Sequence, residues 1–409
     1  MGRFIVSGGR TLEGNVHVSG SKNAALPVIF ASLITHGVSE IRNLPDITDV
    51  NMAIEIIEEL GAKTERIRDT LYIDTTDLDY TLPKADKVSS LRASTYLIGA
   101  GLARFGRVEL QGFGGCNFSK RPIDLHVFAA ESFGAFHQGN VITCKRLIPA
   151  DLSFSKRSVG ATVNALIMAS SAKGASRIYG CAEEPHIFTL IEYLKSAGAR
   201  IDRLDGALCV KGNDLHGGRV SIPGDMIEAG TFLAASLVTG GDISVSGFDP
   251  HELSSFFESL TEGGVNVTVE NGAVSLEGFP KKPISITTAA YPGFPTDLQP
   301  LFSVILARFL GGNIKETVWQ GRFGYLSELA KLGVRYKLDE CGAQIYNSTV
   351  SHGVMRATDL RGGAAGILTA LSAEGRSEIL SGELVLRGYE RLDEKLRRLG
   401  AEIIYVSDE

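Results

Sequence analysis

The hydrophobic and polar positions of the chain predict two kinds of helix that alternate along it. The first kind is apolar on one face and ends at a glycine, followed by a strand, a polar turn and a second strand, as in IEIIEELGAKTERIRDTLYI. Glycine just past the last helical residue is the expected left-handed helix stop. Six such glycines recur 64 to 73 residues apart: Gly61, Gly134, Gly198, Gly264, Gly333 and Gly400. The pattern therefore indicates six internal repeats.

The second kind of predicted helix is rich in small residues and apolar on nearly all sides. Its copies, each followed by a short strand, span residues 23–37, 92–106, 160–174, 229–241, 296–312 and 362–375. Helices without a polar face are expected to be buried, and the amphipathic helices then cover them. Each repeat reads βαβαββ. The expected fold is an α/β, two-domain inside-out barrel with three repeats per domain around buried helices.

The boundary between the two predicted domains lies near Pro223–Glu228, between the third and fourth repeats. We expect residues 22–225 to form the first domain, which carries a loop at about 112–122. Residues 1–21 and 226–409 form the second, with the N-terminal strand completing its repeats. An active site is expected in the cleft between the domains.

Composition narrows the function classes. The net charge of −6 offers no basic excess for nucleic acid, and no apolar run reaches the length of a membrane span. Five scattered cysteines without a CxxC pair argue against a disulfide framework and for a reducing, cytoplasmic location. Without a Rossmann or Walker glycine pattern or a histidine cluster, we expect no cofactor and no metal. The expected state is a monomer or weak homo-oligomer.

Polar and cationic residues stand at the starts of several predicted buried helices. Lys22 and Asn23 head the first and Arg92 the second, Asp297 lies in the first turn of the fifth, and Arg361 just precedes the sixth. Helix N-termini favour acidic side chains, so repeated cations there indicate a phosphate or carboxylate ligand. Ordinary capping residues are the alternative interpretation.

A glycine-rich loop, GFGGCNFSKRPIDLH, surrounds Cys116. Its glycines permit tight reversals, and Lys120 and Arg121 would favour the thiolate if they turn toward the cysteine. This indicates a reactive thiol. The alternative is a glycine-rich hairpin in which the cysteine is incidental.

Over essentially its whole length the chain resembles the UDP-N-acetylglucosamine 1-carboxyvinyltransferases, the enolpyruvyl transferases of peptidoglycan synthesis. Six ordered stretches carry the resemblance: residues 19–27, 116–126, 158–162, 294–297, 357–361 and 387–391. The sister family, 5-enolpyruvylshikimate-3-phosphate synthase, shares the six-repeat architecture but is unlike this chain at the cysteine loop.

The resemblance implies transfer of enolpyruvyl from phosphoenolpyruvate to the 3-hydroxyl of UDP-N-acetylglucosamine, with release of phosphate by addition and elimination. It also implies that Cys116 is the acid and the target of the epoxide fosfomycin, and that Asp297 is the base, with Lys22 a third catalytic residue. The implied phosphoenolpyruvate contacts are Lys22, Arg92, Cys116, Arg121, Arg361 and Arg387. The implied UDP-N-acetylglucosamine contacts are Asn23, Arg92, Arg121, Pro122, Ile123, Asp124, Leu125, Ser158, Val159, Gly160, Asp297 and Val318.

Three departures from the family pattern leave the acceptor open. Gly321 stands where the family has Asn, Leu384-Val385-Leu386 where it has His-Ile-Asp, and Tyr96 where it has Trp. Two alternatives therefore remain. One is a diverged enolpyruvyl transferase with another nucleotide or sugar acceptor. The other is a non-catalytic paralogue that binds a UDP-sugar.

Overall fold

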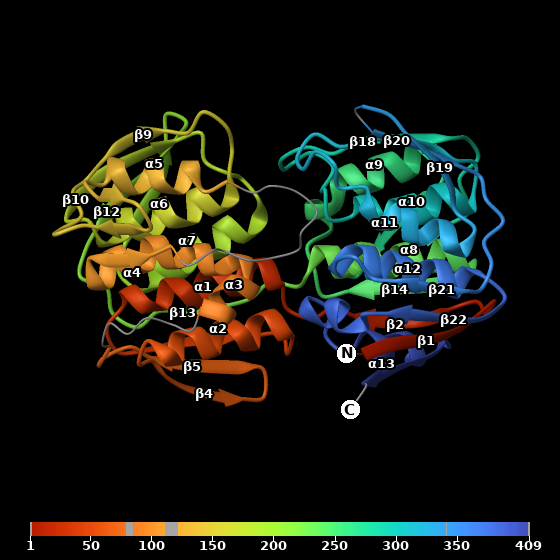
Figure 1. Ribbon diagram of the computed structural model, residues 1–409, viewed down its shortest axis with the longest axis horizontal. Helices are drawn as coiled ribbons and strands as arrows, with labels where there is room; N and C mark the ends of the chain where they lie inside the picture. Colours follow the sequence, from red (N-terminus) through yellow and green to blue (C-terminus); the bar gives the residue numbers. More distant parts are fainter. Residues whose placement is uncertain (1, 79–84, 111–121, 341, 408–409) are drawn as a thin grey trace. The chain divides into compact units, whose positions relative to one another are not determined.

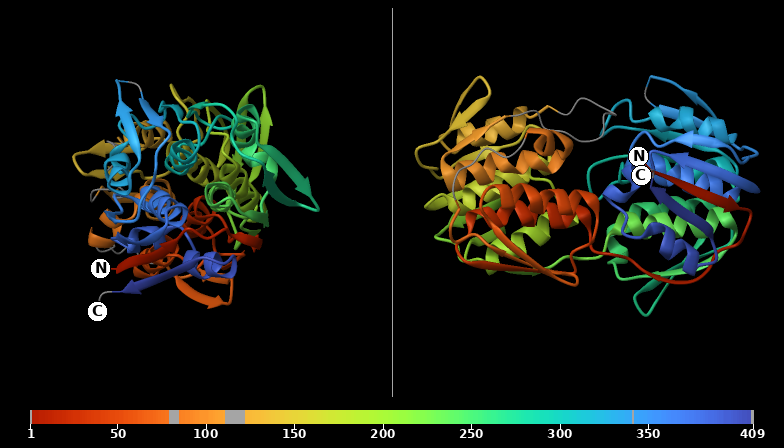
Figure 2. Two further views of the ribbon diagram at one scale, coloured as in Figure 1. Left: turned by 90° about the vertical axis from the view of Figure 1, so that its right-hand side faces the viewer. Right: turned by 60° about the horizontal axis from the view of Figure 1, so that its bottom comes forward.

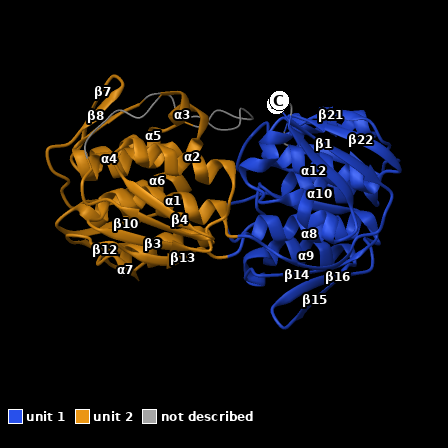
Figure 3. Cartoon of the chain, turned by 90° about the horizontal axis from the view of Figure 1, so that it is seen from below, with its two compact units in different colours: residues 1–19, 116–120, 224–409 blue, residues 20–115, 121–223 orange. Residues whose placement is uncertain are grey.

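The computed structural model describes residues 2–78, 85–110, 122–340 and 342–407, coloured along the chain in Figure 1. Cys116, Arg121 and Cys341 lie outside the described residues. The chain divides into two compact units, which Figure 3 colours separately. Unit 1 comprises the described residues of 1–19 and 224–409, and unit 2 those of 20–115 and 121–223.

Three helices form the centre of unit 2. They are α1 (Lys22–Ala31), α4 (Leu97–Phe105) and α6 (Val159–Ser171). Every residue of α6 from Ala161 to Ser170 is buried, as expected of a helix without a polar face. Short helical segments accompany them: η1 (Ser32–Ile34), α3 (Ala85–Ser90) and η2 (Arg92–Tyr96).

Amphipathic helices and sheets surround this centre. The helices are α2 (Thr48–Glu59), α5 (Asp124–Ser132) and α7 (Pro185–Ser196). In α2 the buried Val50, Ala53 and Ile57 share one face at helical spacing, and this face packs against α1.

Three sheets complete unit 2. The first has the order β13-β3-β5-β4, the second β11-β12-β10-β9 and the third β6-β8-β7. The strands of the first are β3 (Val38–Arg42), β4 (Lys63–Ile67), β5 (Thr70–Asp74) and β13 (Arg219–Ser221). Those of the second are β9 (Asp151–Ser153), β10 (Gly174–Tyr179), β11 (Arg200–Leu204) and β12 (Ala207–Gly212). Those of the third are β6 (Arg107–Glu109), β7 (Phe136–Gln138) and β8 (Val141–Thr143).

Unit 1 repeats this plan. Its central helices α8 (Met226–Thr239), α10 (Gln299–Arg308) and α12 (Leu360–Ser372) pack on one another. The outer helices are α9 (Ser254–Gly263), α11 (Gly324–Leu329) and α13 (Leu392–Arg398). A 3-10 turn lies beside each of them in the chain: η3 (Pro250–Leu253) before α9, η4 (Ala330–Leu332) after α11 and η5 (Gly382–Arg387) before α13.

The sheets of unit 1 have the orders β21-β22-β1-β23, β15-β16-β14-β2 and β17-β18-β20-β19. The strands of the first are β1 (Gly2–Gly8), β21 (Val354–Arg356), β22 (Gly375–Leu380) and β23 (Glu402–Ser407). Those of the second are β2 (Glu13–His17), β14 (Asp242–Ser246), β15 (Asn266–Glu270) and β16 (Ala273–Glu277). Those of the third are β17 (Ile284–Thr287), β18 (Gly312–Lys315), β19 (Arg335–Leu338) and β20 (Gly342–Tyr346).

The N-terminal segment completes two of these sheets. Strand β1 runs antiparallel to both β22 and β23, so the two ends of the chain meet, as both views of Figure 2 show. Strand β2 runs parallel to β14, with Val16 opposite Val245. In the same way β13, late in unit 2, pairs in parallel with β3. The α/β architecture with buried central helices and six repeats is thus confirmed. None of the helices in the described ranges is both long and apolar enough to cross a membrane.

A buried ion pair anchors the N-terminal segment within unit 1. Glu228 of α8 is 2% exposed, and its Oε1 lies 2.5 Å from Nζ of Lys395 in α13. The backbone N–H of Ser19 donates to the other carboxylate oxygen at 2.8 Å, and Lys395 donates to the Ser19 hydroxyl at 2.7 Å. Burial raises the pKa of Glu228 to about 7 even though the charge of Lys395 acts in the opposite direction. The carboxylate is therefore costly to hold ionised without its lysine.

Candidate active site

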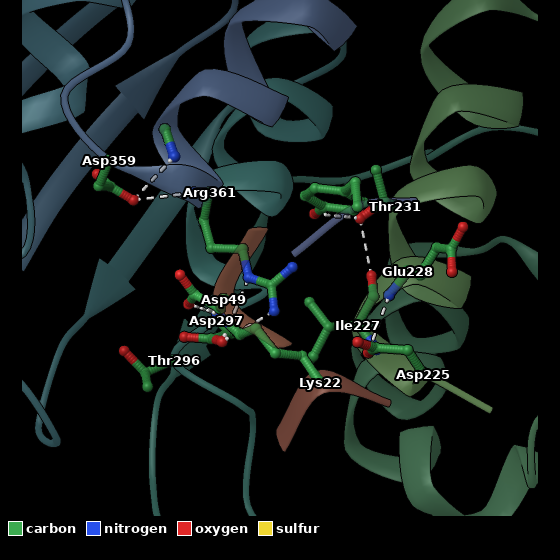
Figure 4. A network of polar contacts seen from close by, with 12 residues as sticks. Lys22, Asp49, Asp225, Ile227, Glu228, Thr231, Thr296, Asp297, Asp359 and Arg361 are labelled. Atoms are coloured by element: carbon green, nitrogen blue, oxygen red, sulfur yellow. Dashed lines mark hydrogen bonds and ion pairs between the residues drawn. The ribbon is translucent and has the colours of Figure 1, made fainter. Parts of the chain in front are cut away.

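In unit 1, Asp297 contacts two buried arginines, Arg322 and Arg361, and Figure 4 shows the second of them. Nη1 of Arg322 is 2.8 Å from its Oδ1, and Nη2 of Arg361 is 3.2 Å from its Oδ2. The arginine side chains are 4% and 1% exposed, whereas that of Asp297 is 29% exposed. The cluster therefore places two buried cations against one carboxylate that remains partly accessible. Such a cluster suits a general base next to anionic substrate groups.

The helices near Asp297 and Arg361 begin at other residues than the sequence predicted. Helix α10 begins at Gln299, so Asp297 lies in the preceding turn and not in the first turn of the helix. Pro300 explains this start, because proline is favoured in a first helical turn. Helix α12 begins at Leu360, so Arg361 belongs to it instead of preceding it. Asp359 is the reason, since its Oδ1 accepts the N–H groups of Arg361 and Gly362 and caps the helix.

An aromatic ring supports Arg361 from the other side. Its guanidinium carbon lies 5.1 Å from the ring centre of Tyr389, within cation–π range. The Tyr389 hydroxyl is in turn 2.8 Å from the hydroxyl of Thr231 in α8. Side chains from α8, α12 and the segment after η5 therefore fix the guanidinium that faces Asp297.

A second predicted contact, Val318, lies in the turn that follows β18. Its N–H donates to Glu316 at 2.8 Å. Glu316 also accepts from the hydroxyl of Thr296, which neighbours Asp297 and accepts from Arg322 at 3.1 Å. The structure thus joins the Val318 turn to the Asp297 cluster.

Sequence reasoning missed Thr296, Glu316 and Arg322 as parts of this cluster. Glu316 and Arg322 are 5% and 3% exposed. Charged residues are seldom buried without a partner, but burial in an irregular segment leaves no periodic pattern in the sequence. The only signal in the sequence was that two charged residues, Glu316 and Arg322, stand close to the predicted contact Val318.

In unit 2, Lys22 is the first residue of α1, followed by Asn23. The Lys22 ammonium lies 3.2 Å from Oδ2 of Asp49 in the first turn of α2, and both side chains are largely buried. Arg92 begins the 3-10 turn η2 and not the α-helix itself, which follows from Leu97. Burial lowers the pKa of Arg92 from its ordinary value, since the cation loses hydration. A bound anion would offset that loss.

The starts of α5 and α6 lie together in unit 2. Ile123 and Asp124 begin α5, and Ser158 caps α6 by accepting from the N–H of Ala161. The side chain of His126, from α5, packs against Gly160 of α6. A Cβ added at Gly160 would come within 2.6 Å of the imidazole. The predicted nucleotide-sugar contacts Ile123, Asp124, Leu125, Ser158, Val159 and Gly160 therefore come from two adjoining helix starts, with Pro122 just before them.

The His126 ring is held as a neutral acceptor. Asn164 Nδ2 donates to its Nδ1 at 2.7 Å, and the same amide donates to the carbonyl of Thr95 at 3.0 Å. Burial, and then the charge of Arg92, lower the pKa of His126 to about 4. Protonation would leave an imidazolium that is only 4% exposed and that faces the donor amide of Asn164, so the charged form is unfavourable in the fold.

We expect His126 to make folding stability pH-dependent. Its pKa in the fold lies below the unfolded value of about 6.5, so its contribution is present above that pH and lost as pH falls through about 4. The contribution amounts to about 3 kcal/mol over this range. Urea unfolding at pH 7 and pH 4.5 should show a smaller acid-induced loss for His126→Gln than for the unsubstituted chain. His251→Gln, at an exposed position, is the control and should keep the full acid-induced loss. Identical pH dependence of all three proteins would contradict this expectation.

Of the three remaining predicted contacts, the structure describes only Arg387. Cys116 and Arg121 lie outside the described residues. Arg387 ends η5 and is partly buried. Just before it, where the family pattern departs, Val385 is fully buried and packs on Gly363.

The departure at Gly321 has a local explanation. Its φ is +82°, and a Cβ there would meet no atom within 4 Å. Asparagine, which the family pattern has here, is among the few other residues that adopt this left-handed region. Glycine therefore allows the same backbone turn before Arg322 as asparagine would. It differs from asparagine only in lacking a side chain, which would have pointed into open space.

Comparisons with known proteins show the family of the chain. The family model EPSP synthase (3-phosphoshikimate 1-carboxyvinyltransferase) matches residues 6–396. UDP-N-acetylglucosamine 1-carboxyvinyltransferase 3 of Caldanaerobacter subterraneus subsp. tengcongensis is 39% identical, and a UDP-N-acetylglucosamine 1-carboxyvinyltransferase 1 of Streptococcus agalactiae is 38% identical, each over 100% of both chains.

Solved structures give the same result. The enolpyruvyl transferase NikO from Streptomyces tendae matches with a TM-score of 0.90 and 26% identity, over 100% of this chain and 99% of its own. EPSP synthase from Acinetobacter baumannii has the same fold, with a TM-score of 0.74 and 17% identity over 100% of both chains. The chain therefore belongs to the enolpyruvyl transferase family that comprises EPSP synthase and the UDP-N-acetylglucosamine 1-carboxyvinyltransferases.

Proposed function

We propose that the chain transfers the enolpyruvyl group of phosphoenolpyruvate to the 3-hydroxyl of UDP-N-acetylglucosamine, releasing phosphate. The observation that carries this proposal is full-length identity of 36–39% to proteins of that activity. The carboxylate of Asp297, paired with two buried guanidiniums, supports it from the structure.

The chemistry needs one acid, one base and fixed cations. Addition joins the acceptor oxygen to C2 of phosphoenolpyruvate, with a proton delivered to C3 and one removed from the hydroxyl. Elimination then removes a C3 proton, breaks the C2–O bond to phosphate and restores the double bond. We assign Asp297 as the base and Cys116 as the acid, with Lys22 beside the reacting centre. Cations stabilise the charge that develops on the substrate.

We assign the substrate contacts from both units to this one reaction. In unit 2 they are Lys22, Asn23, Arg92, Pro122, Ile123, Asp124, Leu125, Ser158, Val159 and Gly160. In unit 1 they are Asp297, Val318, Arg361 and Arg387. Cys116 and Arg121, outside the described residues, complete the proposed set. We further infer that the chain acts in the cytoplasm, as a monomer or weak homo-oligomer, because its scattered cysteines suit a reducing compartment.

A second candidate is an enolpyruvyl transferase with another nucleotide or sugar acceptor. The departures at Gly321 and Leu384–Leu386 favour it, because they flank Arg322 and Arg387. A non-catalytic UDP-sugar-binding paralogue is the third, and the catalytic set Lys22, Cys116 and Asp297 counts against it.

Phosphate release from phosphoenolpyruvate, measured with and without UDP-N-acetylglucosamine, tests the proposal. We expect release that depends on this acceptor. Release with a different UDP- or TDP-sugar only would establish the second candidate. Binding of UDP-N-acetylglucosamine by calorimetry without any release would establish the third.

A further inference from the structure

Glu316 is a buried carboxylate that immediately follows β18, and its partners Thr288, Thr296, Val318 and Trp319 belong to unit 1. Its Oε1 accepts the backbone N–H of Val318 at 2.8 Å and that of Trp319 at 2.9 Å. The hydroxyl of Thr288 donates to the same oxygen at 2.7 Å. One carboxylate oxygen therefore sets the direction of two successive peptide units in the Val318 turn.

The other carboxylate oxygen of Glu316 connects to the Asp297 cluster. Oε2 accepts the hydroxyl proton of Thr296 at 2.8 Å. Because a hydroxyl has only one proton to donate, the Thr296 oxygen must act as an acceptor toward its other neighbour. That neighbour is Nη1 of Arg322, at 3.1 Å.

The same nitrogen of Arg322 reaches Asp297. Nη1 carries two hydrogens, of which one points to Thr296 and the other to Asp297 Oδ1 at 2.8 Å. The guanidinium is 4% exposed and is held in this orientation by both acceptors. Hydrogen bonds thus link Glu316 to the Asp297 carboxylate, with Arg322 donating both to Thr296 and to Asp297.

We propose that Glu316 is a positioning residue for the transfer reaction, which rests on the proposed function of this site. Its Oε1 shapes the Val318 turn that contacts the acceptor sugar nucleotide. Its Oε2 orients Asp297 toward the attacking hydroxyl, through Thr296 and Arg322.

Two substitutions separate these tasks. Glu316→Gln removes an acceptor oxygen and the charge, so both tasks are impaired. We expect kcat to fall and the KM for UDP-N-acetylglucosamine to rise, each about tenfold or more, while the KM for phosphoenolpyruvate changes less than about threefold. Thr296→Val interrupts only the path to Asp297, so kcat should fall about tenfold with the KM for UDP-N-acetylglucosamine within about twofold.

Thr369→Val is the matched control. Thr369 is a fully buried threonine of unit 1, whereas Thr296 is partly buried. The Thr369 hydroxyl donates to the carbonyl of Ala365 within α12. Its kinetic constants should stay within about twofold of the unsubstituted chain. A purely structural role for Glu316 would lower the melting temperature of Glu316→Gln and leave kcat and KM unchanged, which would overturn the proposal.

Hydrogen exchange of the full chain provides a readout independent of turnover. In Glu316→Gln the amides of Val318 and Trp319 should exchange at least about tenfold faster, whereas Thr296→Val should leave them unchanged. If the unsubstituted chain released no phosphate with UDP-N-acetylglucosamine, the proposed function would fail. The role of Glu316 in shaping the turn would then be decided by this exchange, with equal rates in both proteins refuting it.

Discussion

Replacing Asp297 with Asn is expected to lower the turnover of enolpyruvyl transfer by about 10²- to 10⁴-fold, the range typical for removal of a general acid or base. Asn keeps the shape of the side chain, and its remaining oxygen can still accept from one of the two arginines, but it cannot remove the proton of the acceptor hydroxyl. The loss should therefore appear equally in kcat and kcat/KM, with substrate binding retained. Steady-state phosphate release and calorimetric binding of UDP-N-acetylglucosamine measure the two effects.

The control for this experiment is Asp242→Asn, which makes the same chemical change at an exposed position at the start of β14. It should leave turnover unchanged. Because Asp297 also pairs with two buried cations, the melting temperature of each variant must be recorded beside its activity. A folded Asp297→Asn protein with turnover within tenfold of the original would refute the assignment of Asp297 as the base.

The second large effect concerns stability. Lys395→Met leaves the Glu228 carboxylate buried without its cation, and loss of one partner of a buried pair costs about 3–5 kcal/mol. The pKa of Glu228 in the fold, about 7, lies above its unfolded value. Its contribution is therefore present below the unfolded pKa and is lost as pH rises through about 7. Without Lys395 the carboxylate is harder still to ionise, so the variant should lose more stability at pH 8 than at pH 5.

Urea unfolding of the full chain at both pH values tests this result. The double variant Glu228→Gln/Lys395→Met should recover much of the loss at pH 8, because no unpaired charge remains. Lys331→Met removes a lysine from an exposed pair with Glu328 and should cost only about 0–1 kcal/mol. If Lys395→Met proved no more costly than Lys331→Met at pH 8, the buried pair would not have the role assigned to it.

The repeat architecture could be predicted from the sequence because helix periodicity and helix stops are local properties. The burial of α6 and the amphipathic face of α2 follow from residue spacing within a single helix. Gly264 and Gly333 both have positive φ, as their position after a helix predicted. The residues with catalytic chemistry at helix starts could also be found from the sequence, although α10 begins three residues after its predicted start and α12 two residues before its own.

The partners of those residues could not be predicted from the sequence, and the cluster around Asp297 shows why. Arg322 follows it by 25 residues and Arg361 by 64, and two separate turns and helix α12 bring the three side chains together. The same holds for β1 with β23 and for Ser19 with Lys395, at opposite ends of the chain. By itself the sequence determined the repeats, the buried helices and the residue types available for catalysis. Only the tertiary structure decided which charges pair and which are buried, because hydrogen bonds and desolvation depend on distances that local periodicity does not encode.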